Sequence, residues 1–512
     1  MAEIFDRWWL AAKGDLAKYV VPFVQRCEDE LSPIFERIFR LECLYDPNSP
    51  EADPSQKDRV TENAIASNVD TISAIVASVD IRARFMTDGG DWEQQRRARH
   101  LEWYAEDLQK RFGVLAACRR AFKESVKKGN GLVKIHNVLG APRVEHVLIE
   151  NVIVPPDETR DGRASMQLHQ WDYVDADELT LRFPRFADEL ERIRKTGRRR
   201  RGTYSDRGTA NDIECLWSYR LPIGTPPKKY DSRKKYDDYK PGRMTLIADN
   251  LTLVDEPYHK SHFPFAIGVW TDRVHSFYGI GGAERIMGIQ RALNKRNWTI
   301  ESALERTAMP LVLVRPVDGG LAAKANRAGM VATYRGDQPI TFTPPTVNAE
   351  TFQSRVALKQ SAQEEFGQTA MVTHGAKPPG LDSGIALREF TDQTTQRFAG
   401  QEKMFEEDLF LNTIEHLLEA CKDLGDKAPQ VTRRSRFGKR TLKWADVDMD
   451  EVKVQMRASA NLNRTPAGRQ QLVIEFAQAG IISTDQARKL MQHPDLEREL
   501  SLYTAAIEVV EM

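Results

Sequence analysis

The order of segments between His262 and Leu424 constrains this chain more than any other feature. Two long stretches, the first read from Phe263, bracket a proline- and glycine-rich insert at about 309–348. The loop THGAKPPGLDSG then separates the second stretch from a helix of about 40 residues that ends at Leu424. An enzyme pocket does not need this layout. A ring of identical subunits around a hole does, because each subunit must supply a wall, a rim and a constriction.

Length and charge narrow the class of protein. At 512 residues the chain exceeds the size at which one hydrophobic core stops growing, so we expect several subdomains. It holds 74 Lys+Arg and 74 Asp+Glu residues, a formal net charge of zero. This balance excludes a generally basic protein that coats nucleic acid, although it allows local basic patches.

The sequence predicts neither export nor a membrane span. Its longest apolar run is far shorter than the roughly 20 residues that cross a bilayer, and its first residues lack the features of a signal peptide. The cysteines are scattered without a CxxC pair, which favours buried, inert thiols in a reducing compartment. They are Cys27, Cys43, Cys118, Cys215 and Cys421.

The first 280 residues predict helices followed by antiparallel strands. Helical periodicity is expected over 1–45, around 65–79 and over 91–128, with a further helical interlude near 175–195. Short β-branched segments bounded by turns predict the strands. They are LVKIHNV, RVEHVLI, VIVPPDE, MQLHQWDYV, DIECLWSYR and RMTLIADNLTLV, the last a hairpin that turns at Asp249-Asn250.

The helical period returns at Gly282 and lasts until Pro310 ends the helix. Charged residues cover all but one face, on which the apolar residues recur. That stripe consists of Ile286, Ile289, Leu293, Ile300 and Leu304. Gly279, Gly281 and Gly282 precede it in a pattern that only superficially resembles GxGxxG, and we expect them to loosen the start of the helix.

The rest of the chain alternates between helix and strand. Helix resumes near Ala349, and glycines and prolines deny regular structure to the loop that follows, up to Gly384. After the long helix, alternating residues at 430–458 predict strands that return to the earlier sheet. From Asn463 we expect two or three short helices.

A search for catalytic chemistry finds none. The chain has no Walker A pattern, no GxSxG elbow, and no cluster of histidines, cysteines and carboxylates at metal-ligand spacing. We therefore predict no catalytic residues, no metal and no cofactor. Three basic runs, at 198–201, 228–235 and 433–440, are expected in loops; they are either solvated or contact nucleic acid or an acidic partner.

Three motifs in a fixed order carry a resemblance to a known family. They are FYGIGGAERIMGIQRALNKRN, with Tyr278-Gly279, Gln290 and Leu293-Asn294; FGQTAMVTHGAKPPGLDSGIALREFTDQTTQRF, with Ser383-Gly384 and Ala386-Leu387; and RTPAGRQQLVIEFAQAGIISTDQARKLMQHPD. In this order the chain resembles, over almost all its length, the portal proteins of tailed double-stranded-DNA bacteriophages, the connectors between head and tail.

The resemblance implies an α+β, mostly helical portal fold that assembles as a ring. The implied parts are an α/β wing with a helical N-terminus (1–280), a first stem helix (281–308), a small α/β clip (309–348) and a second stem helix (349–370). A tunnel loop (371–384), a spine helix of the wing (385–428), further wing strands (429–462) and a helical crown (463–512) follow.

The resemblance also implies function, partners and location. A homo-oligomeric ring, usually a dodecamer, would form a channel at one capsid vertex, through which double-stranded DNA is packaged and later ejected. Implied partners are the terminase large subunit, then head-completion or tail adaptor proteins, with the major capsid and scaffold proteins around the wing. The expected location is the virion, after assembly in the host cytoplasm, with no membrane partner.

Three sets of site residues follow from this assignment. The tunnel loop would contact DNA through Lys377 at its narrowest point, with His374, Pro378, Pro379, Gly380 and Asp382 around it. The first stem helix would present Arg291, Lys295, Glu301 and Glu305. The clip would contact neighbours and the motor through Leu311, Leu313, Arg315, Tyr334, Ile340 and Phe342.

Two other classes of protein stay open from the sequence. One is another structural protein, such as a tail or baseplate component. The other is a nucleic-acid-processing protein with a helical scaffold, which the missing Walker A pattern and metal cluster disfavour.

Overall fold

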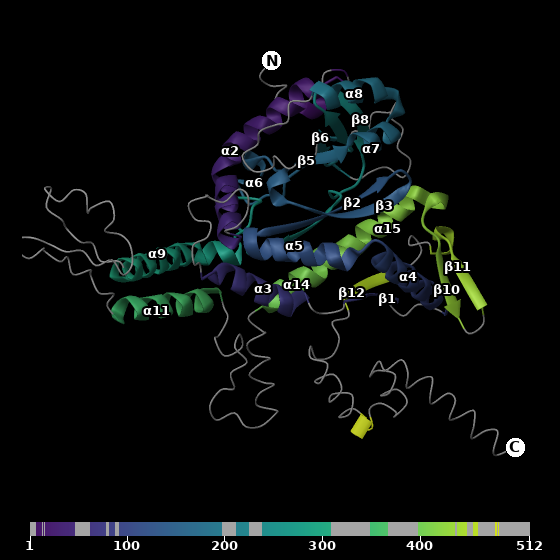
Figure 1. Cartoon of the computed structure of the whole chain (residues 1–512). Coiled ribbons are helices and arrows are strands. Elements are labelled where there is room, and N and C mark those ends of the chain that lie inside the picture. Colours follow the sequence, from purple (N-terminus) through teal and green to yellow (C-terminus); the bar gives the residue numbers. More distant parts are fainter. Residues whose placement is uncertain are drawn as a thin grey trace, which may run out of the picture.

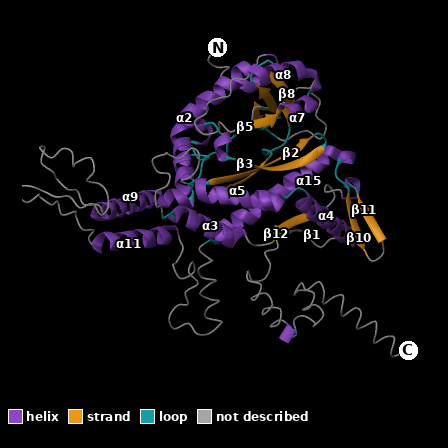
Figure 2. Ribbon diagram, viewed as in Figure 1, coloured by secondary structure: helices purple, strands orange, loops and turns teal. Residues whose placement is uncertain are grey.

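The computed structural model shows an α+β protein in which helices and antiparallel sheets share the core (Figures 1 and 2). It describes residues 7–12, 14, 16–46, 62–77, 81–87, 92–196, 211–224, 238–308, 349–366, 398–435, 438–447, 454–458, 477–478 and 480. The expected clip, the tunnel loop, the first part of the spine helix and all but three residues of the expected crown lie outside these ranges.

The N-terminal segment forms a long amphipathic helix. After a short 3-10 turn (η1, Trp8–Leu10), α2 spans Leu16–Tyr45 and arches along one side of the molecule (Figure 1). Its buried side chains recur at helical spacing and so occupy one face. Pro22 and Pro33 lie inside the helix, and each removes a backbone donor, which accounts for the curved course.

Three helices follow: α3 (Ala64–Ala77), α4 (Trp92–Arg111) and α5 (Val114–Lys128). The expectation of a single helix over 91–128 is therefore wrong. Gly113 adopts a φ of 62°, a left-handed conformation that glycine takes readily, and it separates α4 from α5.

The central strands form two antiparallel sheets, and a hairpin turns at Asp249-Asn250 as predicted. The strand expected from 152 to 158 is only two residues long. The larger sheet has the order β4 (Val152–Ile153), β5 (Gln167–Asp175), β6 (Asp212–Arg220), β7 (Gly242–Ala248), β8 (Leu251–Tyr258). The smaller sheet has the order β3 (Ala141–Val147), β2 (Asn130–Val138), β9 (Phe265–Val269). Short helices connect them: η4 (Ile149–Asn151), α6 (Pro156–Thr159), α7 (Ala176–Arg182), η5 (Pro184–Phe186) and α8 (Ala187–Thr196).

The smaller sheet lies between two hydrophobic cores. Leu132 and Phe265 belong to the core shared with the larger sheet and α2. Their neighbours Val133 and Ala266 belong to the core shared with α3, α4 and α5. Because successive residues of a strand point to opposite faces, β2 and β9 bury both of their faces and join the two cores.

Two helices leave this double core in the same direction (Figure 1). They are α9 (Gly282–Ala308) and α11 (Ala349–Phe366), and they pack against each other. The first long stretch is therefore helical only from Gly282, since residues 265–269 form strand β9.

A second helical run passes against the smaller sheet. It consists of α14 (Ala399–Lys403), a π-helical segment (η7, Met404–Leu411) and α15 (Asn412–Leu424), and it contacts β9 and β2. It ends at Leu424, as expected, where Gly425 has a φ of 53° before the short turn η8 (Gly425–Lys427).

The C-terminal strands do not return to the earlier sheets, and that expectation is wrong. β10 (Val431–Ser435) pairs with β11 (Gly438–Leu442), and β12 (Val454–Ala458) pairs with β1 (Ala83–Thr87). Helix α4 packs against β1 and against η9 (Trp444–Val447), which follows β11, so α4 joins these two ribbons.

Candidate functional site

The helix pair α9 and α11 is the candidate site because its geometry is unusual for a compact domain. Figure 1 shows both helices projecting side by side beyond the core. They run antiparallel: Gly282, which begins α9, lies against Phe366, which ends α11. The chain therefore travels outward along α9 and inward along α11, and residues 309–348 connect the outer ends.

One face of α9 is buried, as the sequence predicts. Ile286 and Leu293 are fully buried and Ile300 nearly so, in the seam that faces the neighbouring helices. Leu304 departs from the prediction, since it is 55% exposed. The seam therefore ends before the outer end of the helix, where no core lies beneath it.

The predicted stem residues lie along the same helix. Arg291 and Lys295 are exposed and Glu301 is partly buried, whereas the side chain of Glu305 lies outside the described part. None of the predicted tunnel-loop and clip residues falls within the described ranges. These are His374, Lys377, Pro378, Pro379, Gly380 and Asp382, and Leu311, Leu313, Arg315, Tyr334, Ile340 and Phe342.

The root of α9 is fixed to the junction between α5 and β2. Asn130 Oδ1 accepts a hydrogen bond of 2.6 Å from the Gly279 N–H, and Asn130 Nδ2 donates to the Phe277 carbonyl at 3.0 Å. The Trp270 N–H donates to the Gly129 carbonyl at 2.8 Å. One buried amide thus satisfies two backbone groups of the segment that leads into α9.

The glycines before α9 permit close packing, a role that the sequence did not predict. A Cβ on Gly281 would lie 2.3 Å from the Lys127 carbonyl oxygen, and one on Gly279 would lie 2.6 Å from Val269 Cγ1. A Cβ on Gly282 would lie 2.7 Å from Phe366 Cζ. Since each distance is below van der Waals contact, only glycine lets α9 approach α5, β9 and α11 this closely.

This packing gives a direct test. We expect Gly281→Ala to lower the free energy of unfolding by about 1–3 kcal/mol, because the new methyl group meets backbone that must move. Gly288→Ala, further along α9, is the matched control: no atom lies within 4 Å of its Cβ position, so it should stabilise by about 0.5–1 kcal/mol. Urea unfolding of both variants measures the difference, and equal stabilities would refute the close-packing role.

Gln290 joins α9 to the start of α3. Its Oε1 accepts from the N–H groups of Ala64 (2.8 Å) and Ile65 (3.3 Å), which have no partner within α3. Its Nε2 donates to the Glu62 carbonyl at 2.9 Å and to Asn294 Oδ1 at 2.7 Å. The residue is 1% exposed, so these bonds stay in a region of low dielectric.

Helix α11 reaches the same point from the other side. Lys359 Nζ lies 2.6 Å from Glu62 Oε1, and Arg355 Nε lies 3.9 Å from Glu62 Oε2. Glu62 therefore links α11 through its carboxylate and α9 through its backbone carbonyl. The start of α3 acts as a clamp that fixes both projecting helices to the core.

Tyr278 anchors the root from the opposite core. Its hydroxyl donates to the Val152 carbonyl at 2.9 Å, and its ring makes an edge contact with Phe35, with centroids 5.6 Å apart. Burial raises the pKa of this hydroxyl, so it stays protonated and keeps donating. Tyr278, Gly279, Gln290 and Asn294, all from one resemblance motif, thus hold α9 in place.

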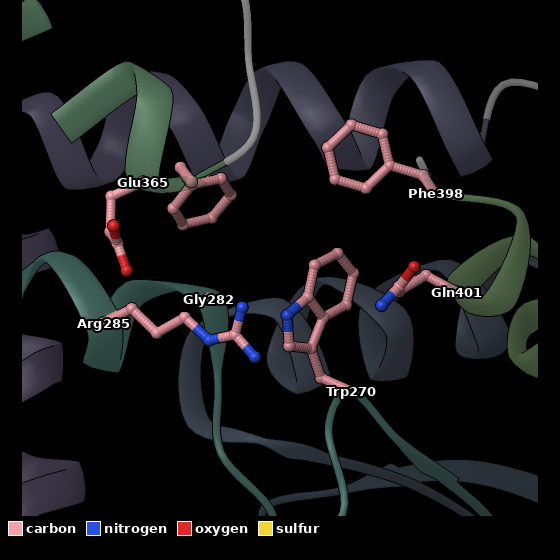
Figure 3. A pocket seen from close by; sticks show the side chains of 7 residues that line it. Trp270, Gly282, Arg285, Glu365, Phe398 and Gln401 are labelled. Carbon is pink, nitrogen blue, oxygen red and sulfur yellow. The ribbon is translucent and has the colours of Figure 1, made fainter. Parts of the chain in front are cut away.

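A small hollow lies where α9, α11 and α14 meet (Figure 3). Its space is about 380 Å³, part of it open to solvent, and Trp270 and Phe398 face each other across it. Arg285, Glu365 and Gln401 add polar groups to its wall. Because Phe366 and Phe398 both line it, the segment 367–397 leaves from and returns to this place.

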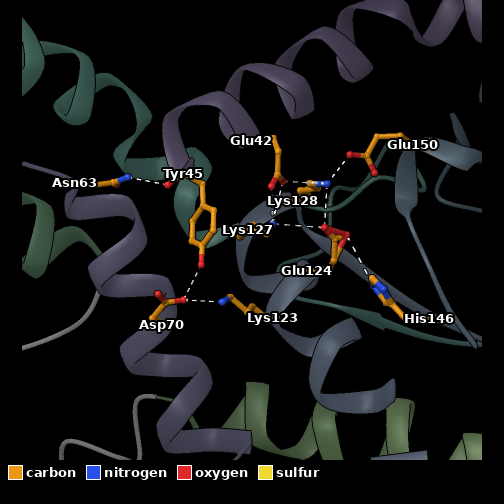
Figure 4. A network of polar contacts seen from close by, with 10 residues as sticks. All are labelled: Glu42, Tyr45, Asn63, Asp70, Lys123, Glu124, Lys127, Lys128, His146 and Glu150. Atoms are coloured by element: carbon orange, nitrogen blue, oxygen red, sulfur yellow. Dashed lines mark hydrogen bonds and ion pairs between the residues drawn. The ribbon is translucent and has the colours of Figure 1, made fainter. Parts of the chain in front are cut away.

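A buried ionic network lies at the end of α5, next to the segment that contacts the root of α9 (Figure 4). Lys128 pairs with three carboxylates: Glu150, Glu124 at 2.9 Å and Glu42 at 3.1 Å. Lys127 pairs with Glu42 at 2.9 Å and lies over the Tyr45 ring, 4.7 Å from its centroid. The two lysines end α5 immediately before Gly129, so the network and the root share one turn of chain.

Burial and the neighbouring charges have opposite effects on the pKa values in this network. Burial alone would raise the pKa of Glu42, but Lys128 and Lys127 outweigh it and lower the pKa to about 2. Burial would lower the pKa of Lys128, but the three carboxylates raise it well above its usual value. The Glu42 carboxylate and Lys128 therefore stay charged at neutral pH, and each depends on the other for its counter-charge.

Sequence reasoning did not find Asn130, Glu42 or the two lysines. Lys127 and Lys128 stand at the end of an amphipathic helix, where cations normally face solvent and the helix dipole. The two lysines can be buried because Glu42 and Glu150, which come from distant segments of the chain, pair with them.

None of the five cysteines forms a disulfide, and burial raises the pKa of Cys118 to about 12 and of Cys421 to about 11. Within the described ranges, no three His, Cys, Asp or Glu residues are placed to hold a metal ion. In the same ranges no helix combines the length and the apolar character that crossing a bilayer requires. Among the described residues, the features that stand out are the packed root of α9 and the buried ionic network. Compared with known proteins, the chain matches no protein-family model and no curated protein.

Proposed function

We propose that this chain is a portal protein of a tailed double-stranded-DNA bacteriophage, one subunit of a ring-shaped channel at a capsid vertex. In this proposal DNA passes through the ring during packaging and ejection. The terminase large subunit docks on the ring first, and head-completion or tail adaptor proteins replace it. Capsid and scaffold proteins surround the wing, and the ring is located in the virion.

The observation that carries the proposal is the projecting antiparallel pair α9 and α11, which is rooted in the core at one end. The outer ends are joined by 309–348, and the inner end of α11 leads into 367–397, which starts and finishes at the hollow beside the root. This arrangement supports two stem helices with a clip at the far end and a tunnel loop at the near end.

The surface of the pair supports assembly into a ring. Phe352 is 42% exposed and Val356 is 51% exposed, and they lie one turn apart on α11. Phe352 lies nearly four helical turns before Phe366, so Phe352 and Val356 continue the core-facing side of α11 beyond the end of the core. In an isolated subunit these apolar side chains are exposed to solvent, whereas a neighbouring copy in a ring would cover them.

Ring closure also determines the charge of the channel. Each side chain is repeated once per subunit, so a single exposed cation becomes a belt of positive charge. The balanced composition of the chain suits a lumen through which phosphates slide, because strong cation belts would bind DNA and stall it. Arg291 and Lys295, with Glu301 further along, give α9 charges of both signs.

Assembly gives the direct test. Negative-stain imaging and light scattering of the purified chain should show a large annulus with a central hole. The double variant Phe352→Lys with Val356→Lys should stay folded, because both positions are exposed, but its ring population should fall at least about 10-fold, since buried charges at an interface are strongly unfavourable.

The matched control adds the same two charges, also one turn apart, at exposed positions on a different side of α11, Ala357→Lys with Ser361→Lys. It should assemble like the unmodified chain. Filaments, or a chain that stays monomeric at every concentration and salt, would contradict the portal assignment. Rings that form equally well in both variants would contradict only the role of α11.

A further inference from the structure

The two small ribbons beside α4 carry an imbalance of charge. β1, β10, β11 and β12 are five residues long each and read ARFMT, VTRRS, GKRTL and VQMRA. They contain six cationic residues and no acidic residue, in a chain with zero formal net charge. The third basic run, expected in a loop, is therefore a hairpin of two strands.

The strand register places these cations opposite one another. Arg433 pairs with Arg440 and Arg434 with Lys439 in the β10–β11 hairpin, and Arg84 pairs with Arg457 in the β1–β12 ribbon. Every cation of the two ribbons thus has a cation as its cross-strand partner. Cross-strand neighbours have Cα atoms about 5 Å apart, and like charges there are destabilising.

A two-stranded sheet is marginally stable in water, and the register of both ribbons stays confined to two strands. Their support comes from α4: Gln109 Nε2 donates to the Ile81 carbonyl at 3.1 Å, and Tyr104 Oη donates to the Pro429 carbonyl at 2.8 Å. Helix α4 therefore fixes the ends of both ribbons, which lie on the same side of the molecule (Figure 2).

We propose that the β1–β12 and β10–β11 ribbons form a binding surface for the phosphate backbone of nucleic acid. Five of the six cations are arginine, whose planar guanidinium matches phosphate oxygens with two parallel hydrogen bonds. An antiparallel two-stranded ribbon also has the width that the major groove of duplex DNA admits.

An acidic protein fits this surface less well. Protein interfaces take their affinity from apolar and aromatic anchors at the centre of the contact. Between Val431 and Leu442 at its base, the hairpin strands hold only threonine, serine, glycine, arginine and lysine. The composition of these hairpin strands suits a uniform polyanion, which needs no apolar pocket, whereas the β1–β12 ribbon adds Arg84 and Arg457 among apolar residues.

The sequence also contains an acidic run that would compete with phosphate for these cations. Asp446, Asp448, Asp450 and Glu451 lie between β11 and β12, and the last three lie outside the described residues. If this acidic run neutralised the ribbons internally, they would have no capacity left for phosphate. The test must separate these two cases.

The experiment uses the full chain and a fluorescent 30-base-pair DNA duplex, with binding measured by anisotropy from 50 to 200 mM salt. We expect a dissociation constant on the order of 10⁻⁶ to 10⁻⁴ M at physiological salt, with a slope that reports the phosphates neutralised. Replacing Arg433, Arg434, Lys439 and Arg440 by glutamine should weaken binding on the order of 100-fold and reduce the salt slope by about 3–4. Because it removes like-charge pairs, this variant should unfold at the same temperature as the unmodified chain or higher.

The matched control removes four exposed cations elsewhere: Arg160, Arg163, Lys195 and Lys403, each to glutamine. It should change affinity less than 2-fold. The proposal is overturned if the unmodified chain does not bind the duplex at 50 mM salt, or if both sets of substitutions weaken binding equally.

Two further experiments test the alternatives, which are pairing with the acidic run and binding of an acidic protein. Binding that appears only after Asp448→Asn, Asp450→Asn and Glu451→Gln would show that the acidic run already occupies the cations. Poly-glutamate that competes as well as duplex DNA would show a general site for acidic partners. The ribbons belong to one chain and need no ring, so a monomer that binds DNA would contradict only the portal proposal.

Discussion

Acidification from pH 7.5 to about pH 5 is expected to lower the stability of this protein by about 8 kcal/mol, enough to unfold a typical core. Four histidines cause this, since the folded state holds each in an environment that disfavours its charged form. Burial, together with Lys134, Arg182 and Arg143, lowers the pKa of His136 to about 2. Burial alone lowers the pKa of His169 to about 3.

The other two histidines behave alike. Burial and the nearby Lys128 and Arg120 lower the pKa of His146 to about 4. Burial and the stacked ring of His262, 4.4 Å away between centroids, lower the pKa of His416 to about 4. An unfolded histidine has a pKa of about 6.5, so below that pH the unfolded chain takes up protons that the folded chain refuses.

The sign and the window follow from these values. Each histidine removes about 1.4 kcal/mol per pH unit between about pH 6.5 and its folded pKa, and four together remove about 5 kcal/mol per unit. Glu42 contributes nothing between pH 7.5 and pH 5, because its loss of stability begins only near its ordinary pKa of 4.5 and continues down to its folded pKa of about 2. Burial raises the pKa of Glu145 and Asp408, which opposes the effect of the histidines but involves fewer and more exposed groups.

Circular dichroism and thermal unfolding between pH 7.5 and 4.5 measure this effect. His169→Gln should move the acid midpoint downward, because glutamine can keep a hydrogen bond to Ser218, which His169 Nδ1 now contacts at 2.8 Å. His275→Gln, at an exposed position, should leave the midpoint unchanged. A stability that is flat from pH 7 to pH 5 would show that these rings are not held neutral.

The elements that the sequence predicts correctly depend on local patterns. The buried stripe of α9 follows from Ile286, Leu293 and Ile300, which one helical period brings to one face. The β7–β8 hairpin follows from the two turn residues at Asp249-Asn250 between β-branched runs. Such signals need only neighbours within about a dozen residues, so a single sequence contains them.

The elements that it misses depend on distant partners. β1 is five residues long and exists because β12 pairs with it, although more than half of the chain separates them in sequence. The π-helical segment Met404–Leu411 packs against β9, where a Cβ on Gly268 would lie 2.5 Å from Met404 Sδ. A helical period can show that such a segment is helical, but it does not reveal an extra residue in a turn.

The candidate site also combines features that local sequence patterns predict with features that depend on distant partners. The motif residues Tyr278, Gly279 and Gln290 stand out in sequence, yet their roles as anchor, close contact and helix cap depend on Val152, Gly129 and Ala64. The acceptor for the Gly279 N–H, Asn130, lies 149 positions away in sequence and belongs to no motif. Sequence thus identified the helix that projects, whereas the structure identifies the residues that hold it.

Replacing Lys128 by methionine is expected to lower the free energy of unfolding by about 3–5 kcal/mol, the cost of breaking a buried ion network on one side. The side chain of Lys128 is 3% exposed and touches Glu42, Glu124 and Glu150. Without it, Lys127 alone must balance three carboxylates. Lys123→Met is the matched control at the rim: its partner is Asp70 at 2.8 Å, both side chains are more than a third exposed, and the loss should stay below about 1 kcal/mol.

The same variant separates electrostatics from packing. If the loss comes from unbalanced carboxylates, adding Glu150→Gln to Lys128→Met should restore part of the stability, because it removes the carboxylate that had paired with Lys128. If the loss comes from packing, the second substitution should restore nothing. Lys128 directly precedes Gly129, which supports the root of α9, so the charge-driven loss should also make the α9–α11 pair exchange its amide hydrogens faster. Unchanged exchange in these two helices, despite a large loss of stability, would show that the ionic network supports the core without holding the projecting pair.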